Sequence, residues 1–141
     1  MPEPGASPFW WEREQLHYDK GHLRFAGEKV QAIARRFGTP TFLYSASRIR
    51  ENLARIREAL ETIGRPYRLH YAMKANRFAP ILTLMANEKL CGIDACAPEE
   101  VMHAMGCGFK ESEISYTATA VSNRDLDTLV RFKKLHINCD A

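Results

Sequence analysis

Residues 68–76, RLHYAMKAN, join a β-prone run of alternating character to the start of a helix, and one lysine stands at the junction. Lys74 lies where a buried strand would run out, and Ala72 and Ala75 leave room around it. Partial desolvation favours the neutral, nucleophilic form of an amine, so a lysine in this place suits Schiff-base chemistry. The commoner alternative is a lysine that extends from the strand end into solvent, because lysine side chains are mostly exposed.

The same step from strand to helix recurs along the chain. We expect five strands, at residues 41–44, 67–73, 91–94, 113–117 and 135–139, with a helix between each successive pair. Strict alternation of strands and helices predicts a parallel sheet built from right-handed βαβ units. An open doubly wound sheet and a closed (β/α)8 barrel both have this order.

Capping residues and apolar periodicity place the helices. Gly38 is suited to end the first helix, and Ser45 or Ser47 to begin the second. Ser122 and Asp125 form a capping box before the last helix. From the helix that begins at residue 98 we expect Val101, Met102 and Met105 to face the core, and the apolar residues after the capping box are Leu126, Leu129 and Val130.

The lack of phosphate-binding glycine motifs favours the barrel. No Gly-x-Gly-x-x-Gly turn follows any expected strand, and Gly106-Cys107-Gly108 stands at a helix end without the third glycine. A complete barrel needs about 250 residues, whereas the sequence has 141. We therefore expect an α/β fold that is the N-terminal part of an incomplete (β/α)8 barrel, within a longer natural protein.

A different pattern precedes the first helix. Residues 1–7 are rich in proline and glycine and suggest a mobile tail, and residues 9–11 (FWW) are an aromatic cluster that needs an apolar surface. Residues 16–18 and 23–25 flank a turn with a glycine and are expected to form a β-hairpin, which needs a packing partner to be stable. We place a domain boundary here, with the tail and hairpin in residues 1–27 and the barrel portion in residues 28–141.

Composition argues against several classes of protein. The chain is 45% hydrophobic and 26% charged, and its formal net charge is only +3. Arginines between residues 48 and 57 are interleaved with glutamates as on a solvated helix face, so we expect no nucleic-acid partner. No apolar run approaches the roughly 18 residues of a membrane span, and the N-terminus lacks the layout of a signal peptide. The four cysteines form no Cys-x-x-Cys pair, which predicts a reducing cytoplasm and no metal site.

Three segments at matching intervals resemble one protein family. Residues 71–76 (YAMKAN) are similar to the cofactor-lysine motif of the pyridoxal-phosphate decarboxylases with an alanine-racemase-like barrel, which include the diaminopimelate, ornithine and arginine decarboxylases. Residues 92–100 (GIDACAPEE) are similar to that family's following segment, with a glutamate six residues after an aspartate. Residues 114–117 (ISYT) and 137–140 (INCD) resemble its next two strands. The likeness runs from about residue 37 to the end.

The resemblance implies that Lys74 is the cofactor lysine. It would form a Schiff base with pyridoxal phosphate and then exchange it for the substrate amine. The cofactor would accept the electrons left behind as carbon dioxide departs. Ala72, together with Tyr71 and Asn76, would shape the pocket around the cofactor.

Two carboxylates complete the implied cofactor site. The resemblance places Asp94 and Glu100 beside the cofactor, where a carboxylate would help to hold the charge state of the lysine and move protons. Structural alternatives stay open for both. Asp94 could cap the turn after its strand, and Glu100 could stabilise a helix N-terminus through the helix dipole.

Two differences bear on the reaction. The racemase branch usually continues from its lysine as Ala-Asp-Ala-Tyr-Gly, unlike residues 75–79 (ANRFA), so the decarboxylase branch is favoured. Many relatives have a Gly/Asn-rich turn where residues 118–122 read ATAVS, which leaves the subgroup open. The resemblance implies decarboxylation of meso-2,6-diaminopimelate to L-lysine, in lysine biosynthesis, by a full-length homodimer.

Other interpretations remain beside this one. The protein could be an ornithine- or arginine-type decarboxylase, or a non-catalytic, pyridoxal-phosphate-binding or regulatory relative. It could also be a small independent α/β protein with a residual motif. In the favoured interpretation we expect the 141 residues alone to be inactive.

Overall fold

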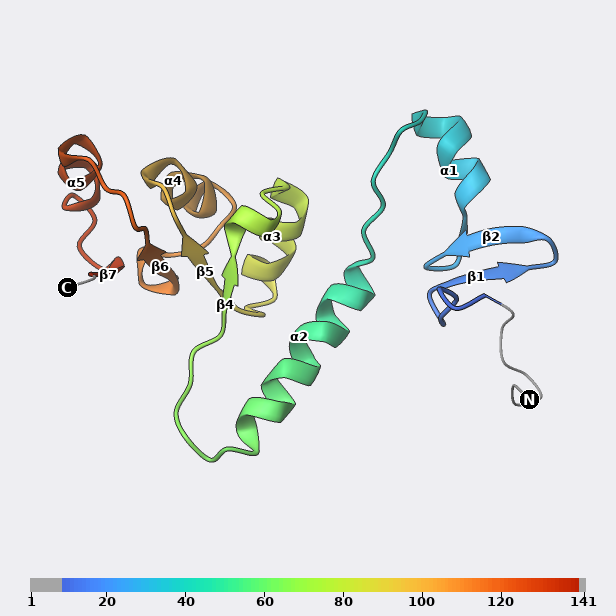
Figure 1. Cartoon of the computed structure of the whole chain (residues 1–141), viewed down its shortest axis with the longest axis horizontal. Helices are drawn as coiled ribbons and strands as arrows, with labels where there is room; N and C mark the ends of the chain where they lie inside the picture. The colour runs from blue at the N-terminus through green and yellow to red at the C-terminus, as the bar shows by residue number, and fades with distance from the viewer. Residues whose placement is uncertain (1–8, 140–141) are drawn as a thin grey trace. The chain divides into compact units, whose positions relative to one another are not determined.

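The computed structural model describes residues 9–139, which fall into two compact units, residues 1–49 and residues 50–141. Each unit is described by itself (Figure 1). The tail expected at residues 1–7 and Asp140, the last residue of the INCD segment, lie outside the described residues.

The first unit contains a three-stranded antiparallel sheet. Its strands pair in the order β1 (Leu16–Asp19), β2 (His22–Phe25) and β3 (Glu28–Lys29). Gly21 has a φ of 76° in the tight turn between β1 and β2, a conformation that glycine adopts without strain. The predicted hairpin is confirmed, and β3 extends it by a third strand that the sequence pattern did not indicate.

The aromatic residues before β1 pack on that strand. The rings of Phe9 and Trp11 stack with centroids 5.3 Å apart, and both contact Tyr18 of β1 at 5.8 and 5.9 Å. Trp10 is not part of this cluster, since 95% of it is exposed. Two of the three aromatic residues therefore find an apolar surface within the first unit.

Helix α1 (Val30–Phe37) follows and ends at Gly38, whose φ of 83° confirms the predicted C-terminal glycine. The strand predicted at residues 41–44 is wrong, because this segment has no regular structure and Phe42 is 84% exposed. A strand is held by hydrogen bonds to its neighbours, and no strand in the described part of the chain pairs with residues 41–44. Helix α2 (Ala46–Glu61) begins after Ser45, whose Oγ accepts the backbone N–H of Arg48 at 3.2 Å, so Ser45 is the cap.

Four parallel strands organise the second unit. They lie side by side in the order β4 (His70–Ala72), β5 (Gly92–Ala95), β6 (Ile114–Thr117) and β7 (His136–Asn138). The connections carry α3 (Ala79–Asn87), α4 (Pro98–Gly106), α5 (Asn123–Leu129) and two 3-10 turns, η1 (Met73–Ala75) and η2 (Glu111–Glu113), as Figure 1 shows. The Ser122–Asp125 capping box is present. The predicted alternation is thus confirmed for four of the five expected strands.

The core of this unit lies between one face of the sheet and helices α3, α4 and α5. Its most deeply buried side chains include Ile93, Ile114 and Tyr116 of the strands and Leu82, Val101 and Leu129 of the helices. The predicted inward orientation holds for Val101, but Met102 and Met105 are exposed. In α5, Leu129 is buried, whereas Leu126 and Val130 are exposed. A short helix buries only a narrow stripe, and Ala104, three residues after Val101, occupies that stripe in α4.

No helix in residues 9–139 is both long and apolar enough to cross a membrane.

Candidate functional site

Lys74 lies in the turn that leaves the carboxyl end of β4. It is the middle residue of η1, and its side chain is exposed while its neighbour Met73 is fully buried. Within the described residues Lys74 makes no ion pair and no hydrogen bond through its side chain. The buried methionine fixes the backbone at this point, and the amine of Lys74 is left available at the edge of the sheet.

The rest of the YAMKAN motif closes this turn. The hydroxyl of Tyr71 donates to the backbone carbonyl of Asn76 at 3.4 Å, and the side-chain oxygen of Asn76 accepts the backbone N–H of Phe78 at 2.9 Å. Asn76 thereby leads the chain into α3, which begins one residue after Phe78. Tyr71 and Asn76 therefore hold the shape of the loop around Lys74.

Asp94 is brought to the same edge by the parallel register. It pairs with Ala72 on one side and with Ser115 on the other. Successive residues of a strand point to opposite faces, so Asp94 faces away from the core that buries its neighbours Ile93 and Ala95. Its carboxylate does not cap the turn after β5 by any hydrogen bond in the described residues; Oδ1 instead accepts the Thr117 hydroxyl at 2.9 Å.

Three further polar side chains belong to this face, and the sequence analysis did not assign them a role. The amide nitrogen of Asn138 on β7 donates to Thr117 Oγ1 at 2.7 Å and to Ser115 Oγ at 3.0 Å. Together with Asp94 they form a hydrogen-bonded row across β5, β6 and β7. The signal available in the sequence was the alternation of polar residues, Ser115 with Thr117 and His136 with Asn138, at the ends of two successive strands.

Glu100 lies apart from this row, in the first turn of α4. It is only 7% exposed, and its Oε2 accepts the backbone N–H of Cys96 at 2.8 Å. Its Oε1 lies 3.9 Å from the guanidinium of Arg77, three residues after Lys74. Glu100 therefore acts in this structure as a hydrogen-bond acceptor at the N-terminus of α4. Its contact with a cofactor stays a prediction.

His70 and Gly92 fit against each other at the other end of this face. A side chain at position 92 would collide with the imidazole of His70 and with the carbonyl oxygen of Glu113. Burial lowers the pKa of His70, while the negative charge of Asp94 opposes that change and the positive charge of Arg68 adds to it. Arg68 also donates to Nε2 of His136 at 2.9 Å, which requires that nitrogen to be unprotonated.

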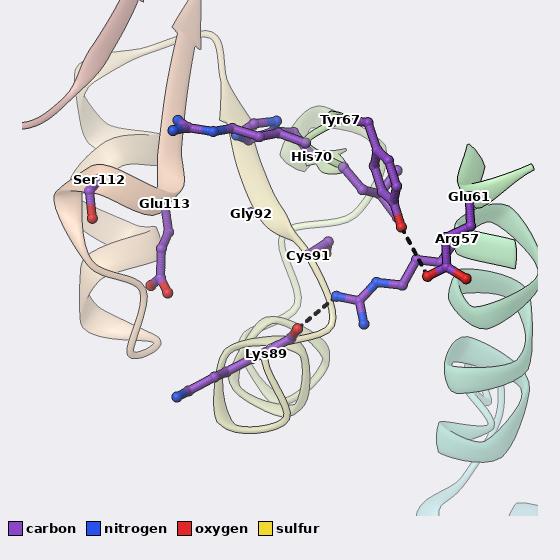
Figure 2. A pocket seen from close by; sticks show the side chains of 11 residues that line it. Arg57, Glu61, Tyr67, His70, Lys89, Cys91, Gly92, Ser112 and Glu113 are labelled. Atoms are coloured by element: carbon purple, nitrogen blue, oxygen red, sulfur yellow. Dashed lines mark hydrogen bonds between the residues drawn. The ribbon is translucent and has the colours of Figure 1, made fainter. Parts of the chain in front are cut away.

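A cavity of about 460 Å³ opens at the amino-terminal edge of the sheet (Figure 2). It is lined by residues that lead into β4, β5 and β6, and Figure 2 shows Arg57 donating to the carbonyl of Lys89 on its rim. Burial raises the pKa of the Cys91 thiol, which lines this cavity, to about 11. Lys74 and Asp94 are not among the lining residues, because they lie at the opposite, carboxyl-terminal edge.

The residues at the carboxyl-terminal edge suit a Schiff-base cofactor. Such a cofactor needs an accessible amine without a competing ion pair, and Lys74 meets that condition within the described residues. It also needs carboxylate and hydroxyl groups nearby to exchange hydrogen bonds, which Asp94 and Thr117 provide on the adjoining strands. Active sites of (β/α)8 barrels lie at this end of their strands.

Comparison with known proteins identifies the family of this chain. The family model for the pyridoxal binding domain of pyridoxal-dependent decarboxylases matches residues 46–141. A diaminopimelate decarboxylase of Methanothermobacter thermautotrophicus is 34% identical over 108 residues, which cover 77% of this chain and 25% of that protein. The chain therefore spans about a quarter of the length of this curated relative.

Solved structures show the same fold. The diaminopimelate decarboxylase of M. jannaschii superposes with a TM-score of 0.82 at 23% identity, over 90% of this chain and 30% of its own. The enzyme of Helicobacter pylori, solved in complex with L-lysine, gives a TM-score of 0.65 at 25% identity, over 77% of this chain and 28% of its own. The predicted α/β fold, the N-terminal part of a (β/α)8 barrel, is thus confirmed. The chain therefore belongs to the family of the pyridoxal-dependent decarboxylases.

Proposed function

We propose that the protein containing this chain is a pyridoxal-phosphate-dependent amino-acid decarboxylase and that Lys74 is the residue that carries the cofactor. The observation behind the proposal is the free amine of Lys74 at the carboxyl end of β4, at the same edge of the sheet as the hydrogen-bonded row that ends at Asp94. Bound pyridoxal phosphate supplies an electron sink for the pair left when carbon dioxide departs. The protein supplies the amine, the orientation of the ring and the control of protons.

The residues on this edge have distinct roles in the proposal. Lys74 holds the cofactor through its amine, and the small side chain of Ala72, in register with Asp94, leaves room for the ring. Asp94 offers a negative charge near the lysine and the nitrogen groups of cofactor and substrate. Glu100 acts through Arg77, because its other oxygen is engaged by the backbone of Cys96.

We propose meso-2,6-diaminopimelate as the substrate and L-lysine as the product. The support is that the curated relative described above is a diaminopimelate decarboxylase. The Helicobacter pylori relative was crystallised with L-lysine, a small amino acid of the same chemical class. An ornithine- or arginine-type decarboxylase is one alternative, and a non-catalytic, pyridoxal-phosphate-binding or regulatory relative is the other.

Further features of the proposal concern the whole protein. We propose a cytoplasmic homodimer that is active only when its chain includes the remainder of the barrel. We also propose that residues 1–27 form a segment distinct from the barrel portion, residues 28–141. The support for an incomplete site is that the chain spans 25% of its curated relative.

Reduction of the cofactor complex tests the role of Lys74. The protein expressed from its complete reading frame is incubated with pyridoxal phosphate, reduced with borohydride and mapped by peptide mass spectrometry. We expect the pyridoxyl mass on Lys74 and its loss in Lys74→Arg, which keeps the charge but has no primary amine. Lys134→Arg is the matched control, since Lys134 is also exposed and lies away from the site.

Each part of the proposal has a result that would contradict it. A label on another lysine, or none in the wild-type protein, excludes Lys74 as the cofactor residue. A labelled protein without turnover of diaminopimelate, ornithine or arginine favours the non-catalytic relative. Turnover of ornithine or arginine in preference to diaminopimelate identifies the alternative within the family.

A further inference from the structure

The row of hydrogen bonds across β5, β6 and β7 has a direction. Asn138 uses its amide N–H groups on two hydroxyls, those of Ser115 and Thr117, at 3.0 and 2.7 Å. Thr117 has a single proton, and it donates that proton to Asp94 Oδ1 at 2.9 Å. Because a hydroxyl that accepts from an amide keeps its own proton for another partner, the row runs from amide to hydroxyl to carboxylate.

This direction determines what Asp94 can do. Asp94 Oδ1 is an acceptor, because it receives the hydrogen bond of the Thr117 hydroxyl. Oδ1 is thereby committed to β6, and Oδ2 makes no hydrogen bond in the described part of the chain. The carboxylate is consequently held by one oxygen while the other is left for a ligand at the edge where Lys74 lies.

The register of the sheet makes the arrangement specific. Thr117 is paired with Asn138, and Ser115 is paired with Asp94, so the four side chains share one face on three adjacent strands. The opposite face carries Ile93, Ile114 and Tyr116 and is buried against the helices. The polar row is therefore not part of the packing that holds the sheet together. Thr117 and Asn138 are both exposed in this structure, so the hydrogen bonds between them contribute little to stability.

We propose that Thr117 and Asn138 are positioning residues that hold the Asp94 carboxylate in the orientation required at the cofactor site. The proposal rests on the function proposed above, in which Lys74 carries pyridoxal phosphate. Asn138 orients the Thr117 hydroxyl, and that hydroxyl orients Asp94. Neither residue needs to touch the cofactor for this purpose.

Substitution of Thr117 separates positioning from packing. In the complete reading frame, Thr117→Val keeps the shape of the side chain and removes the hydroxyl, whereas Thr117→Ser restores it. The control is Thr128→Val, because the Thr128 hydroxyl donates only to the Arg124 carbonyl within α5. Three quantities are measured for each variant: the dissociation constant of pyridoxal phosphate for the apoprotein, kcat and KM separately, and Tm.

The expected pattern distinguishes the variants. A hydrogen bond to a charged group corresponds to about a tenfold change in an equilibrium or rate constant. We expect Thr117→Val to weaken cofactor binding and to lower kcat, each about tenfold, with KM and Tm close to the wild-type values. Thr117→Ser should recover both quantities to within about threefold, and Thr128→Val should match the wild type. Asn138→Leu removes the amide at the start of the row and should also weaken cofactor binding and lower kcat. If Thr117→Val does not fold, Asn138→Leu is the variant that tests the positioning role.

The outcomes also separate this inference from the proposed function. If wild-type protein binds pyridoxal phosphate on Lys74 but Thr117→Val and Asn138→Leu behave like Thr128→Val, the positioning role is wrong and the function stands. The positioning role is equally wrong if the two variants lower Tm but leave cofactor binding and kcat unchanged. If the wild type forms no adduct on Lys74, the proposed function fails before the variants are compared.

Discussion

At the scale of single residues, His70 shows how the sheet perturbs a titratable group. Its imidazole packs over Gly92, the one residue type that leaves space between it and the Glu113 carbonyl. Burial lowers the pKa of His70, the negative charge of Asp94 partly reverses this, and the positive charge of Arg68 reinforces it. The folded protein therefore favours the neutral imidazole.

This environment gives a prediction for Asp94→Asn. The substitution removes the negative charge that raises the pKa of His70, so we expect that pKa to fall further below its ordinary value, 6.5. NMR titration of the His70 imidazole in the complete protein measures the change, and Asp125→Asn on α5 is the control. An unchanged or raised pKa would show that Asp94 does not face His70.

The sign of the pH effect on stability follows from the same shift. A histidine whose pKa is lowered on folding stabilises the folded state above the unfolded value and loses that contribution as the pH falls through the folded value. Asp94→Asn should therefore make the protein more sensitive to acid below about pH 6.5 than the wild type. Urea denaturation at a series of pH values reports this difference directly.

Only some of the candidate site residues could be predicted from the sequence. Lys74 and Asp94 could be proposed because each occurs in a short motif with a characteristic spacing. Thr117 and Asn138 could not, since their meeting depends on the register of β6 and β7, which no local pattern specifies. A polar residue at a strand end is common, and only its partner on the next strand shows what it does.

At the scale of elements, Glu100 connects a loop to a helix. Its Oε2 satisfies the N–H of Cys96 just before α4, and Glu100 is nearly fully buried. We expect Glu100→Ala to lower the free energy of unfolding by about 1–3 kcal/mol, because the acceptor of that N–H is lost from a buried place. Glu100→Gln keeps an acceptor oxygen and should retain most of the stability.

Chemical denaturation of the two variants measures this effect, and Glu99→Ala is the matched control because Glu99 lies exposed in the same helical turn. The comparison also addresses the cofactor role of Glu100. If Glu100→Gln is as stable as the wild type but binds pyridoxal phosphate weakly, the charge of Glu100 acts on the site. If only Glu100→Ala changes, and only in stability, the residue is a structural acceptor.

Elements were predicted well where local chemistry decides them. The hairpin turn, Gly38, and the capping box at Ser122 are set by residues close in sequence, and all three are confirmed. The strand at residues 41–44 failed because β-prone composition cannot form a strand without a neighbour to pair with. Met102 and Met105 were placed inward on apolarity alone, but the rotation of their helix is fixed by its contacts with the sheet.

At the scale of the whole molecule, the barrel class was predictable because strict strand–helix alternation allows few topologies. The choice between an open sheet and a barrel came from missing glycine motifs and from the resemblance, and the fold of the solved relatives confirmed it. The sequence did not predict which side chains of the sheet are covered by other elements. Ile137 on β7 is in register with Tyr116, which is buried, yet Ile137 is 39% exposed.

This exposed position leads to a prediction about the 141 residues expressed alone. Apolar side chains such as Val130 and Ile137 should make the isolated segment self-associate and bind the dye ANS. The outer edges of β4 and β7, with which no strand in residues 9–139 pairs, should add to this effect. The product of the complete reading frame should do neither. Ile137→Lys should reduce association of the isolated segment, because a charge at a strand edge opposes pairing. In the complete protein the same substitution should be destabilising if further barrel elements cover that face. Size-exclusion chromatography and ANS fluorescence on both lengths measure these effects. A monodisperse, cooperatively unfolding 141-residue chain with no dye binding would instead support a small independent α/β protein.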